Sequence, residues 1–281
     1  MNRRRFLLSA GSVATLGLLN RSSYSDPTPL TIKIWVTEAA TAYPSCRRRS
    51  VEYLRPALAS ARPDVSFSFG RQPVSVAGDD RYVERIDWPR QVLAGAAGAG
   101  PIDPVADVNL LLTDGSITDS SVGYAYDHIA TVPGARYLAS MPAADSVPSV
   151  VDYSQSAAVV QLLLHEVGHA LGLGHQHGSV VASSGHVTVS PMVSGYAWAP
   201  AAVQAAELPA ETCTEPHTEL PPRIDTATDS PADSSPNGGM GRVNDEPTDS
   251  GSAAGRDRRL SFAFSPCAER AIRAYPRRRV P

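Results

Sequence analysis

Three histidines and one glutamate occupy the stretch 165–175 at spacings suited to binding a metal ion. The stretch reads H-E-x-x-H-x-x-G-x-x-H, with His165, Glu166, His169, Gly172 and His175 at its fixed positions. On an α-helix, His165 and His169 project from the same face because they are four residues apart, so both imidazoles can reach one ion. Glu166 lies beside them, where its carboxylate can accept a proton from a water molecule that the metal activates.

The glycine at position 172 predicts the end of this helix. Glycine adopts the left-handed conformation at a helix C′ position without steric penalty, and the bend after it can bring His175 back as a third ligand. Three protein ligands leave the fourth tetrahedral position of zinc open, which is typical of a catalytic site and not of a structural one. We therefore expect one Zn²⁺ ion bound by His165, His169 and His175.

A methionine-containing segment comes after the histidines. Residues 190–196 read S-P-M-V-S-G-Y. Together with the complete match over 165–175, this segment resembles the metzincin zinc endopeptidases, in which the histidine motif is followed by a Met-turn. The resemblance implies that Met192 lies beneath the three imidazoles as a hydrophobic floor. It also implies that Glu166 is the catalytic general base and that the residues after Met192 form one wall of a specificity pocket.

Two positions differ from the subfamilies of this clan. Gln176 follows the third histidine, where the subfamilies carry an acid, a proline, a serine or a threonine. Ser194 stands where astacin-like and serralysin-like enzymes have a tyrosine that helps to stabilise the oxyanion. Tyr196 is the nearest tyrosine and is the candidate for that role. The resemblance therefore extends to the clan and not to a subfamily.

The expected substrate is a protein or peptide bound in an extended conformation. A short strand is predicted over Val122, Gly123, Tyr124 and Ala125, and substrate can add to such an edge strand through main-chain hydrogen bonds. Asp114 and Asp119 flank a Gly-Ser turn and could bind Ca²⁺, but turn and capping roles are more common for such residues.

The segments around the motif predict an α+β fold of the zincin type. We expect a small twisted mixed sheet, backing helices and a long active-site helix, followed by a largely irregular C-terminal region. The expected strands are 31–36, 65–69, 105–113, 122–126 and 135–139. The expected helices are 46–61, kinked or started by Pro56, a short one at 88–94 and the motif helix at 153–173.

The two ends of the chain differ in composition from its middle. Residues 1–25 combine four arginines with an apolar run and resemble a twin-arginine export signal, an ordinary secretory signal or uncleaved anchor being the alternative. Residues 26–204 form the predicted catalytic domain. Residues 205–281 are predicted to be a low-complexity, disordered tail with a basic end, because they hold too few apolar residues to offset the entropy of ordering. We expect an exported protein, extracellular or on the cell surface, with no transmembrane helix in its mature form.

Charge, hydrophobic content and cysteine count add further expectations. The net charge of −3 does not favour nucleic acid as a partner, and a hydrophobic content of 42% suffices for a substantial core. Cys46, Cys213 and Cys267 allow at most one internal disulfide, whose pairing stays open. We expect a monomer.

Two other functions stay open beside the endopeptidase. One is a catalytically weak zinc-binding protein, and the other is a cell-surface interaction protein that acts through its tail. Glu166 favours the enzyme, because a structural zinc site does not need a carboxylate next to its ligands.

Overall fold

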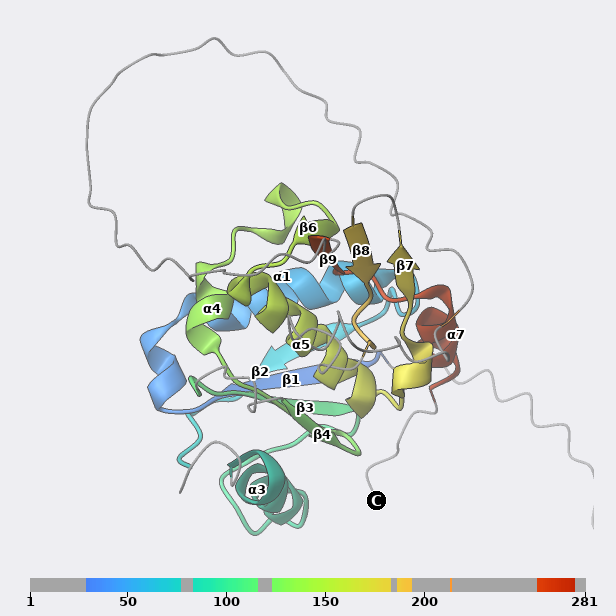
Figure 1. Ribbon diagram of the computed structural model, residues 1–281. Coiled ribbons are helices and arrows are strands. Elements are labelled where there is room, and N and C mark those ends of the chain that lie inside the picture. Colours follow the sequence, from blue (N-terminus) through green and yellow to red (C-terminus); the bar gives the residue numbers. More distant parts are fainter. Residues whose placement is uncertain are drawn as a thin grey trace, which may run out of the picture.

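Two β-sheets lie on either side of the helix that carries the histidines (Figure 1). The computed structural model describes residues 29–76, 83–115, 123–182, 186–193, 213 and 257–275. The predicted α+β fold with mixed sheets, backing helices and a long motif helix is confirmed. The predicted signal over residues 1–25 lies outside the described residues.

The larger sheet has five strands in the order β2-β1-β3-β5-β4. These strands are β1 Thr31–Val36, β2 Ser66–Phe69, β3 Val108–Leu112, β4 Tyr124–Tyr126 and β5 Ile129–Val132. The first four in that order are parallel to one another, whereas β4 runs antiparallel to β5 and forms one edge. All five residues of β3 are buried, as expected for a central strand covered on both faces.

Helices cover both faces of this sheet (Figure 1). The helices α1 Ser45–Ala59, α4 Ala135–Ser140 and α5 Gln155–Ala170 lie on one face, and α3 Trp88–Ala96 lies on the other. Because successive strand residues point to opposite faces, Ile34 packs with the α1 and α5 side chains, whereas Trp35 packs against Trp88 of α3. The helix α1 begins at Ser45, so Pro56 lies inside it and does not start it.

The smaller sheet has four strands in the order β6-β9-β8-β7. They are β6 Val150–Asp152, β7 Val180–Ala182, β8 His186–Val189 and β9 Asp257–Ser261, and the helix α7 Pro266–Ala274 comes after β9. The remaining described helical turns are Ala39–Ala42, Val83–Asp87, Ala144–Ser146 and His175–His177. Among the described residues, none of the helices combines the length and the apolar character that crossing a bilayer demands.

The prediction of a disordered C-terminal tail is wrong for residues 257–275. The strand β9 is an inner strand of the smaller sheet, parallel to β8 and antiparallel to β6. Leu260, Phe262, Phe264 and Ile272 are buried in the main core, so this segment gains its order from contacts that its own composition does not reveal. The boundary predicted at residue 204 therefore does not mark the end of the folded part of the chain.

A second prediction is also wrong, because residues 135–139 form the helix α4 and not a strand. Gly134 has a φ of +86° and turns the chain, and its carbonyl then accepts hydrogen bonds from the N–H groups of Tyr137 and Leu138. The buried residues Ala135 and Leu138 are three apart, which is a helical spacing.

Candidate metal centre

The helix α5 is buried around nearly its whole circumference. It begins at the N-cap Ser154, whose hydroxyl accepts a hydrogen bond of 3.1 Å from the N–H of Ala157. All but three of its residues are buried, among them His165 and Glu166, which are only 5% and 4% exposed. A helix that is apolar on all sides belongs to the interior of a protein, and this one holds the two histidines in a fixed frame.

The end of α5 has the hydrogen bonds of a Schellman motif. Gly172 has a φ of +82°, as its position after the helix predicted. Its N–H donates to the carbonyl of His169 at 2.8 Å, and the N–H of Leu173 donates to the carbonyl of Gly168 at 2.9 Å. The chain then reverses into the short 3₁₀ turn His175–His177, which brings His175 back towards the helix.

Backbone carbonyls orient two of the imidazoles. Nδ1 of His165 lies 2.6 Å from the carbonyl oxygen of Pro191, and Nδ1 of His169 lies 2.8 Å from that of Leu173. A carbonyl oxygen can only accept a hydrogen bond, so each Nδ1 carries the hydrogen and each Nε2 presents a lone pair. Metal-binding histidines are usually held in this way by a partner on the other ring nitrogen.

The Nε2 atoms of the three histidines converge on one point. Nε2 of His169 lies 2.9 Å from Nε2 of His165 and 3.2 Å from Nε2 of His175. The three ligand atoms all lie within 4.8 Å of one another. Two nitrogens that bind one tetrahedral zinc at about 2.0–2.1 Å are roughly 3.3 Å apart, so these separations fit a metal ion.

Burial keeps these imidazoles neutral. It lowers the pKa of His165 to about 3, with a smaller contribution from the neighbouring His169, and it also lowers the pKa values of His169 and His175. With both Nδ1 hydrogens committed to carbonyls, the lone pairs of His165 and His169 face each other with no hydrogen between them. A cation bound by both nitrogens would relieve that repulsion, so the three residues can hold a metal ion.

Met192 packs directly on the histidine helix. Its side chain is fully buried, and a Cβ added to Gly168 would lie only 2.4 Å from its Sδ. Gly168 precedes His169 on α5 and lies within one turn of His165, so the contact is made between the two ligands. Glycine at this position allows the methionine to approach the helix backbone.

The side chain of Glu166 extends from α5 towards the edge of the larger sheet. A Cβ added to Gly123 would be 2.6 Å from Cγ of Glu166 and 2.8 Å from the carbonyl oxygen of Thr131 in β5. Tyr124 and Ala125 come next, in the edge strand β4. The predicted site residues Val122 and Tyr196 lie outside the described residues.

Two further candidates from the sequence do not join this centre. His177 folds back so that its Nδ1 lies 3.0 Å from the nitrogen and 3.1 Å from the oxygen of Gly174, away from the converging nitrogens of the other three. Asp114, considered for calcium, is bound by Arg136, whose Nε and Nη2 each donate to it at 3.0 Å. Asp119 lies outside the described residues.

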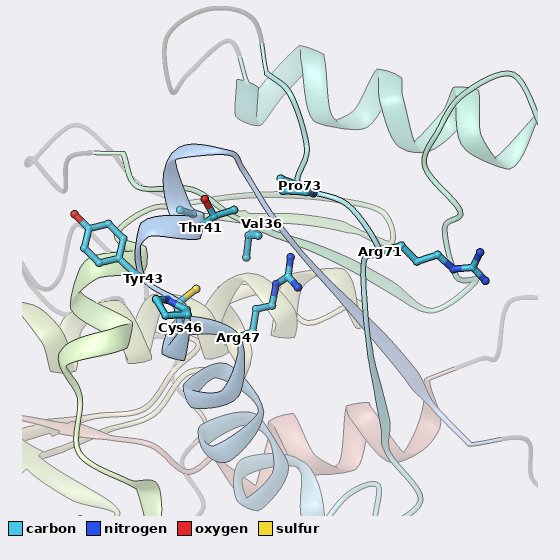
Figure 2. A pocket seen from close by; sticks show the side chains of 9 residues that line it. Val36, Thr41, Tyr43, Cys46, Arg47, Arg71 and Pro73 are labelled. Atoms are coloured by element: carbon cyan, nitrogen blue, oxygen red, sulfur yellow. The ribbon is translucent and has the colours of Figure 1, made fainter.

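A separate cavity of about 310 Å³ lies at the N-terminal end of α1 (Figure 2). Its lining residues are Val36, Ala40, Thr41, Tyr43, Pro44, Cys46, Arg47, Arg71 and Pro73. Burial raises the pKa of the Cys46 thiol to about 11, so this free cysteine is protonated at neutral pH. None of the three histidines lines the cavity, which is therefore distinct from the metal centre.

Comparison with known proteins identifies a similar solved structure. No protein-family model matches the chain, and no curated protein matches it. The crystal structure of archaemetzincin from Methanopyrus kandleri is similar to it, with 19% sequence identity over 56% of this chain and 79% of that chain and a TM-score of 0.32. Both the identity and the TM-score are low, so this likeness carries no argument about function.

Proposed function

We propose that this protein is a zinc-dependent endopeptidase of the metzincin type. The observation that carries the proposal is the convergence of three neutral imidazole nitrogens beside Glu166. A site with three imidazole ligands suits zinc and leaves a coordination position open. A site that served only stability would have no need of the adjacent buried carboxylate.

Glu166 acts as the general base. A zinc ion held by His165, His169 and His175 would supply Lewis acidity and would lower the pKa of a water molecule from about 16 towards ~7. Glu166 accepts the proton of the attacking water and later delivers it to the nitrogen of the leaving amine, so that the carboxylate is regenerated at the end of the cycle. Its side chain is almost completely buried where α5 packs against Gly123, which restricts it to a narrow range of positions.

The edge strand β4 binds the substrate. It pairs with β5 on one side, and among the described residues no strand pairs with its other side, where a peptide in extended conformation can add. Gly123, the residue just before β4, lies against Glu166, which brings the strand next to the reacting groups. Main-chain pairing of this kind predicts broad backbone affinity, with side-chain preference set by the residues after Met192.

We further propose that the protein is exported. The disulfide between Cys213 and Cys267 supports this, since such bonds persist in oxidising compartments outside the cytosol. The twin-arginine-like residues near the N-terminus supply the signal, and export in a folded state suits a protein whose last described strand, β9, lies inside a sheet.

Proteolysis by the purified protein tests the proposal. Casein cleavage is measured for the wild-type protein, after removal of zinc by a chelator, after zinc is restored, and for Glu166→Gln. Glu38→Gln, at an exposed glutamate outside the site, is the control. We expect one zinc per chain, activity that is lost and regained with the metal, and a loss of about 10²–10⁴-fold in Glu166→Gln with zinc still bound. A wild-type protein that binds one zinc but cleaves neither casein nor peptides would refute the enzymatic role.

A further inference from the structure

The loop that carries the third histidine has its own support, which comes from the C-terminal segment 257–275 and from Cys213, the residue that is disulfide-bonded to that segment. His175 is not on α5 but in the turn His175–His177 after it, so the helix alone does not fix it. The carbonyl of His177, at the end of this turn, accepts a hydrogen bond from Ser265, and the carbonyl of Gly178, just after it, accepts one from Cys213. The chemistry of the histidine motif does not itself use these contacts.

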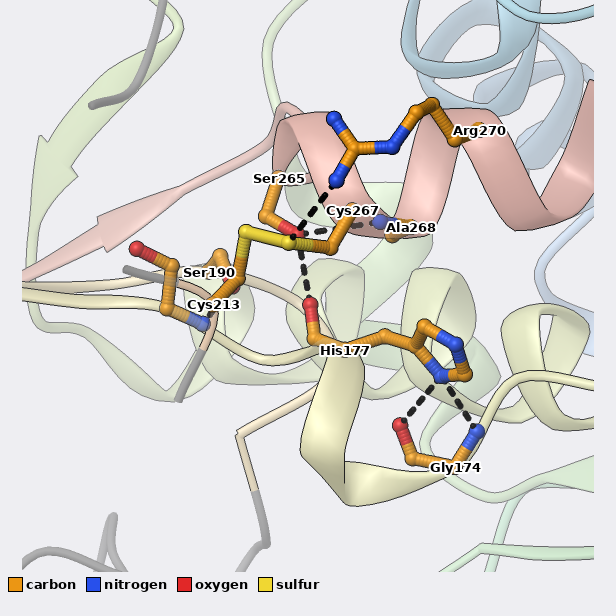
Figure 3. The surroundings of a disulfide bond; sticks show 9 residues. Gly174, His177, Ser190, Cys213, Ser265, Cys267, Ala268 and Arg270 are labelled. Atoms are coloured by element: carbon orange, nitrogen blue, oxygen red, sulfur yellow. Dashed lines mark hydrogen bonds between the residues drawn. A yellow bond between two sulfur atoms is a disulfide. The ribbon is translucent and has the colours of Figure 1, made fainter. Parts of the chain in front are cut away.

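Ser265 makes two hydrogen bonds with one hydroxyl group (Figure 3). It is the N-cap of α7, where its Oγ accepts from the N–H of Ala268 at 3.1 Å. The same hydroxyl donates to the carbonyl oxygen of His177 at 2.5 Å. The residue is 1% exposed, so water cannot replace either bond. The first turn of α7 is thereby joined to the His175 turn.

A disulfide supplies the second connection. The N–H of Cys213 donates to the carbonyl oxygen of Gly178 at 2.6 Å, and Cys213 is bonded to Cys267, two residues after Ser265 (Figure 3). Two successive carbonyls of the loop therefore accept hydrogen bonds from Ser265 and Cys213. The disulfide connects Cys213 to Cys267, which lies two residues after Ser265.

The other side of the loop is closely packed. A Cβ added to Gly178 would lie 2.9 Å from both the carbonyl carbon of Met192 and the nitrogen of Val193, and 3.0 Å from the carbonyl oxygen of His175. The loop is thus confined between the Met192 turn and the C-terminal segment, and this packing restricts the conformations that it can adopt.

The C-terminal segment also touches the histidine helix. A Cβ added to Gly168 would lie 3.3 Å from Cε1 of Phe264, and one added to Gly172 would lie 3.8 Å from Cδ2 of Tyr275. The same segment therefore contacts both the helix that holds two ligands and the loop that holds the third.

We propose that Ser265 and the Cys213–Cys267 disulfide are positioning groups that set the distance of His175 from the other two ligands. They act through the loop backbone and touch neither metal nor substrate. The inference rests on the proposed function in taking His165, His169 and His175 as the zinc ligands. Partners that orient a metal ligand typically account for about 10–100-fold in metal affinity, which sets the size of the expected effect.

The structure offers a matched control for each substitution. Ser154 caps α5 with the same 3.1 Å bond that Ser265 makes to α7, but only Ser265 also donates to the His175 loop. Ser154→Ala and Ser265→Ala thus both lose an N-cap, which costs typically ~1 kcal/mol of stability. Cys46→Ser removes a buried cysteine outside the site and is the control for the double variant Cys213→Ser/Cys267→Ser.

The test measures zinc affinity of the full chain by competition with a chelating indicator, together with the visible spectrum of the Co²⁺-loaded protein, which reports coordination geometry. Thermal unfolding of the metal-free form and casein cleavage are measured beside them. We expect Ser265→Ala and the double cysteine variant to bind zinc roughly tenfold more weakly, with an altered Co²⁺ spectrum. Ser154→Ala and Cys46→Ser should keep the wild-type affinity and spectrum.

Two outcomes overturn the inference: a folded Ser265→Ala protein with wild-type zinc affinity, or an equal loss of affinity in Ser154→Ala. If the double cysteine variant does not fold, the comparison of the two serine variants decides. If the wild-type protein binds zinc but does not cleave casein, the proposed peptidase is refuted. If zinc affinity is nevertheless lowered in Ser265→Ala and not in Ser154→Ala, this inference remains supported.

Discussion

Replacing Gly123 by alanine should disable Glu166 without removing the metal. The added Cβ would lie 2.6 Å and 2.9 Å from Cγ and Cδ of Glu166 and 2.8 Å from the carbonyl oxygen of Thr131. Each distance is roughly 1 Å short of the optimal separation of about 3.5–4.0 Å. Thr131 lies in β5, which is paired on both sides, so its backbone cannot yield easily. The Glu166 side chain, or the edge strand that binds substrate, has to move instead.

A displacement of that size has a predictable effect on the reaction. Misplacing a reacting group by about 1 Å can cost 10²-fold in rate, which corresponds to about 2.7 kcal/mol of activation free energy. We expect kcat to fall by about that factor in Gly123→Ala. Zinc affinity should stay at the wild-type value, because the three atoms nearest to the new methyl group belong to Glu166 and Thr131 and not to a histidine.

The assay combines steady-state cleavage of a quenched fluorescent peptide with zinc titration. Gly100→Ala is the control, since a Cβ at that position meets its neighbours only at ordinary contact distances of 3.6 Å and beyond. A double variant adds a sharper condition. If the methyl group acts through Glu166, then Gly123→Ala should lower kcat little further in a protein that already carries Glu166→Gln. Wild-type kcat in Gly123→Ala, or full additivity in the double variant, would refute the reasoning.

Three further predictions concern stability and reactivity. Gly172→Ala should lower the stability of the metal-free protein to urea by about 1–2 kcal/mol, because φ is +82° there, and should weaken zinc binding by shifting the Leu173 carbonyl that orients His169. The metal-free protein should lose stability to heat as the pH falls from ~6.5 towards 3. The pKa of His165 is lowered to about 3 in the folded state, so below ~6.5 the unfolded chain binds a proton that the folded chain does not. Finally, iodoacetamide should leave Cys46 unmodified at pH 8 in the native protein, because its thiol is buried with a pKa of about 11, and should label it after unfolding; labelling of the native protein would contradict this.

The part of the centre that could be predicted from the sequence is the part built from local geometry. His165 and His169 are one helical turn apart, and Gly172 has the conformation expected of a helix C′ residue. These relations need only helix periodicity and the steric freedom of glycine. The strand 31–36 is predictable for a similar reason, since its β-branched and aromatic residues mark it locally.

The groups that orient the histidines could not be predicted in the same way. His165 and His169 are held by the carbonyls of Pro191 and Leu173, and every residue has a carbonyl, so no residue type marks these partners. The contact of Gly123 with Glu166 joins positions far apart in the chain. Only the pairing of β4 with β5 and the packing of α5 on both bring them together.

The C-terminal segment shows most clearly where composition misleads. The strand β9 reads D-R-R-L-S, and its single apolar residue, Leu260, is fully buried. Its order comes from pairing with β6 on one side and β8 on the other, which satisfies its backbone and needs no apolar run. Residues 190–256 separate β8 from β9 in the sequence. Two strands of one sheet can thus be separated in the sequence by a stretch that is poor in apolar residues. The segment 257–275, which follows that stretch, contacts the loop of His175.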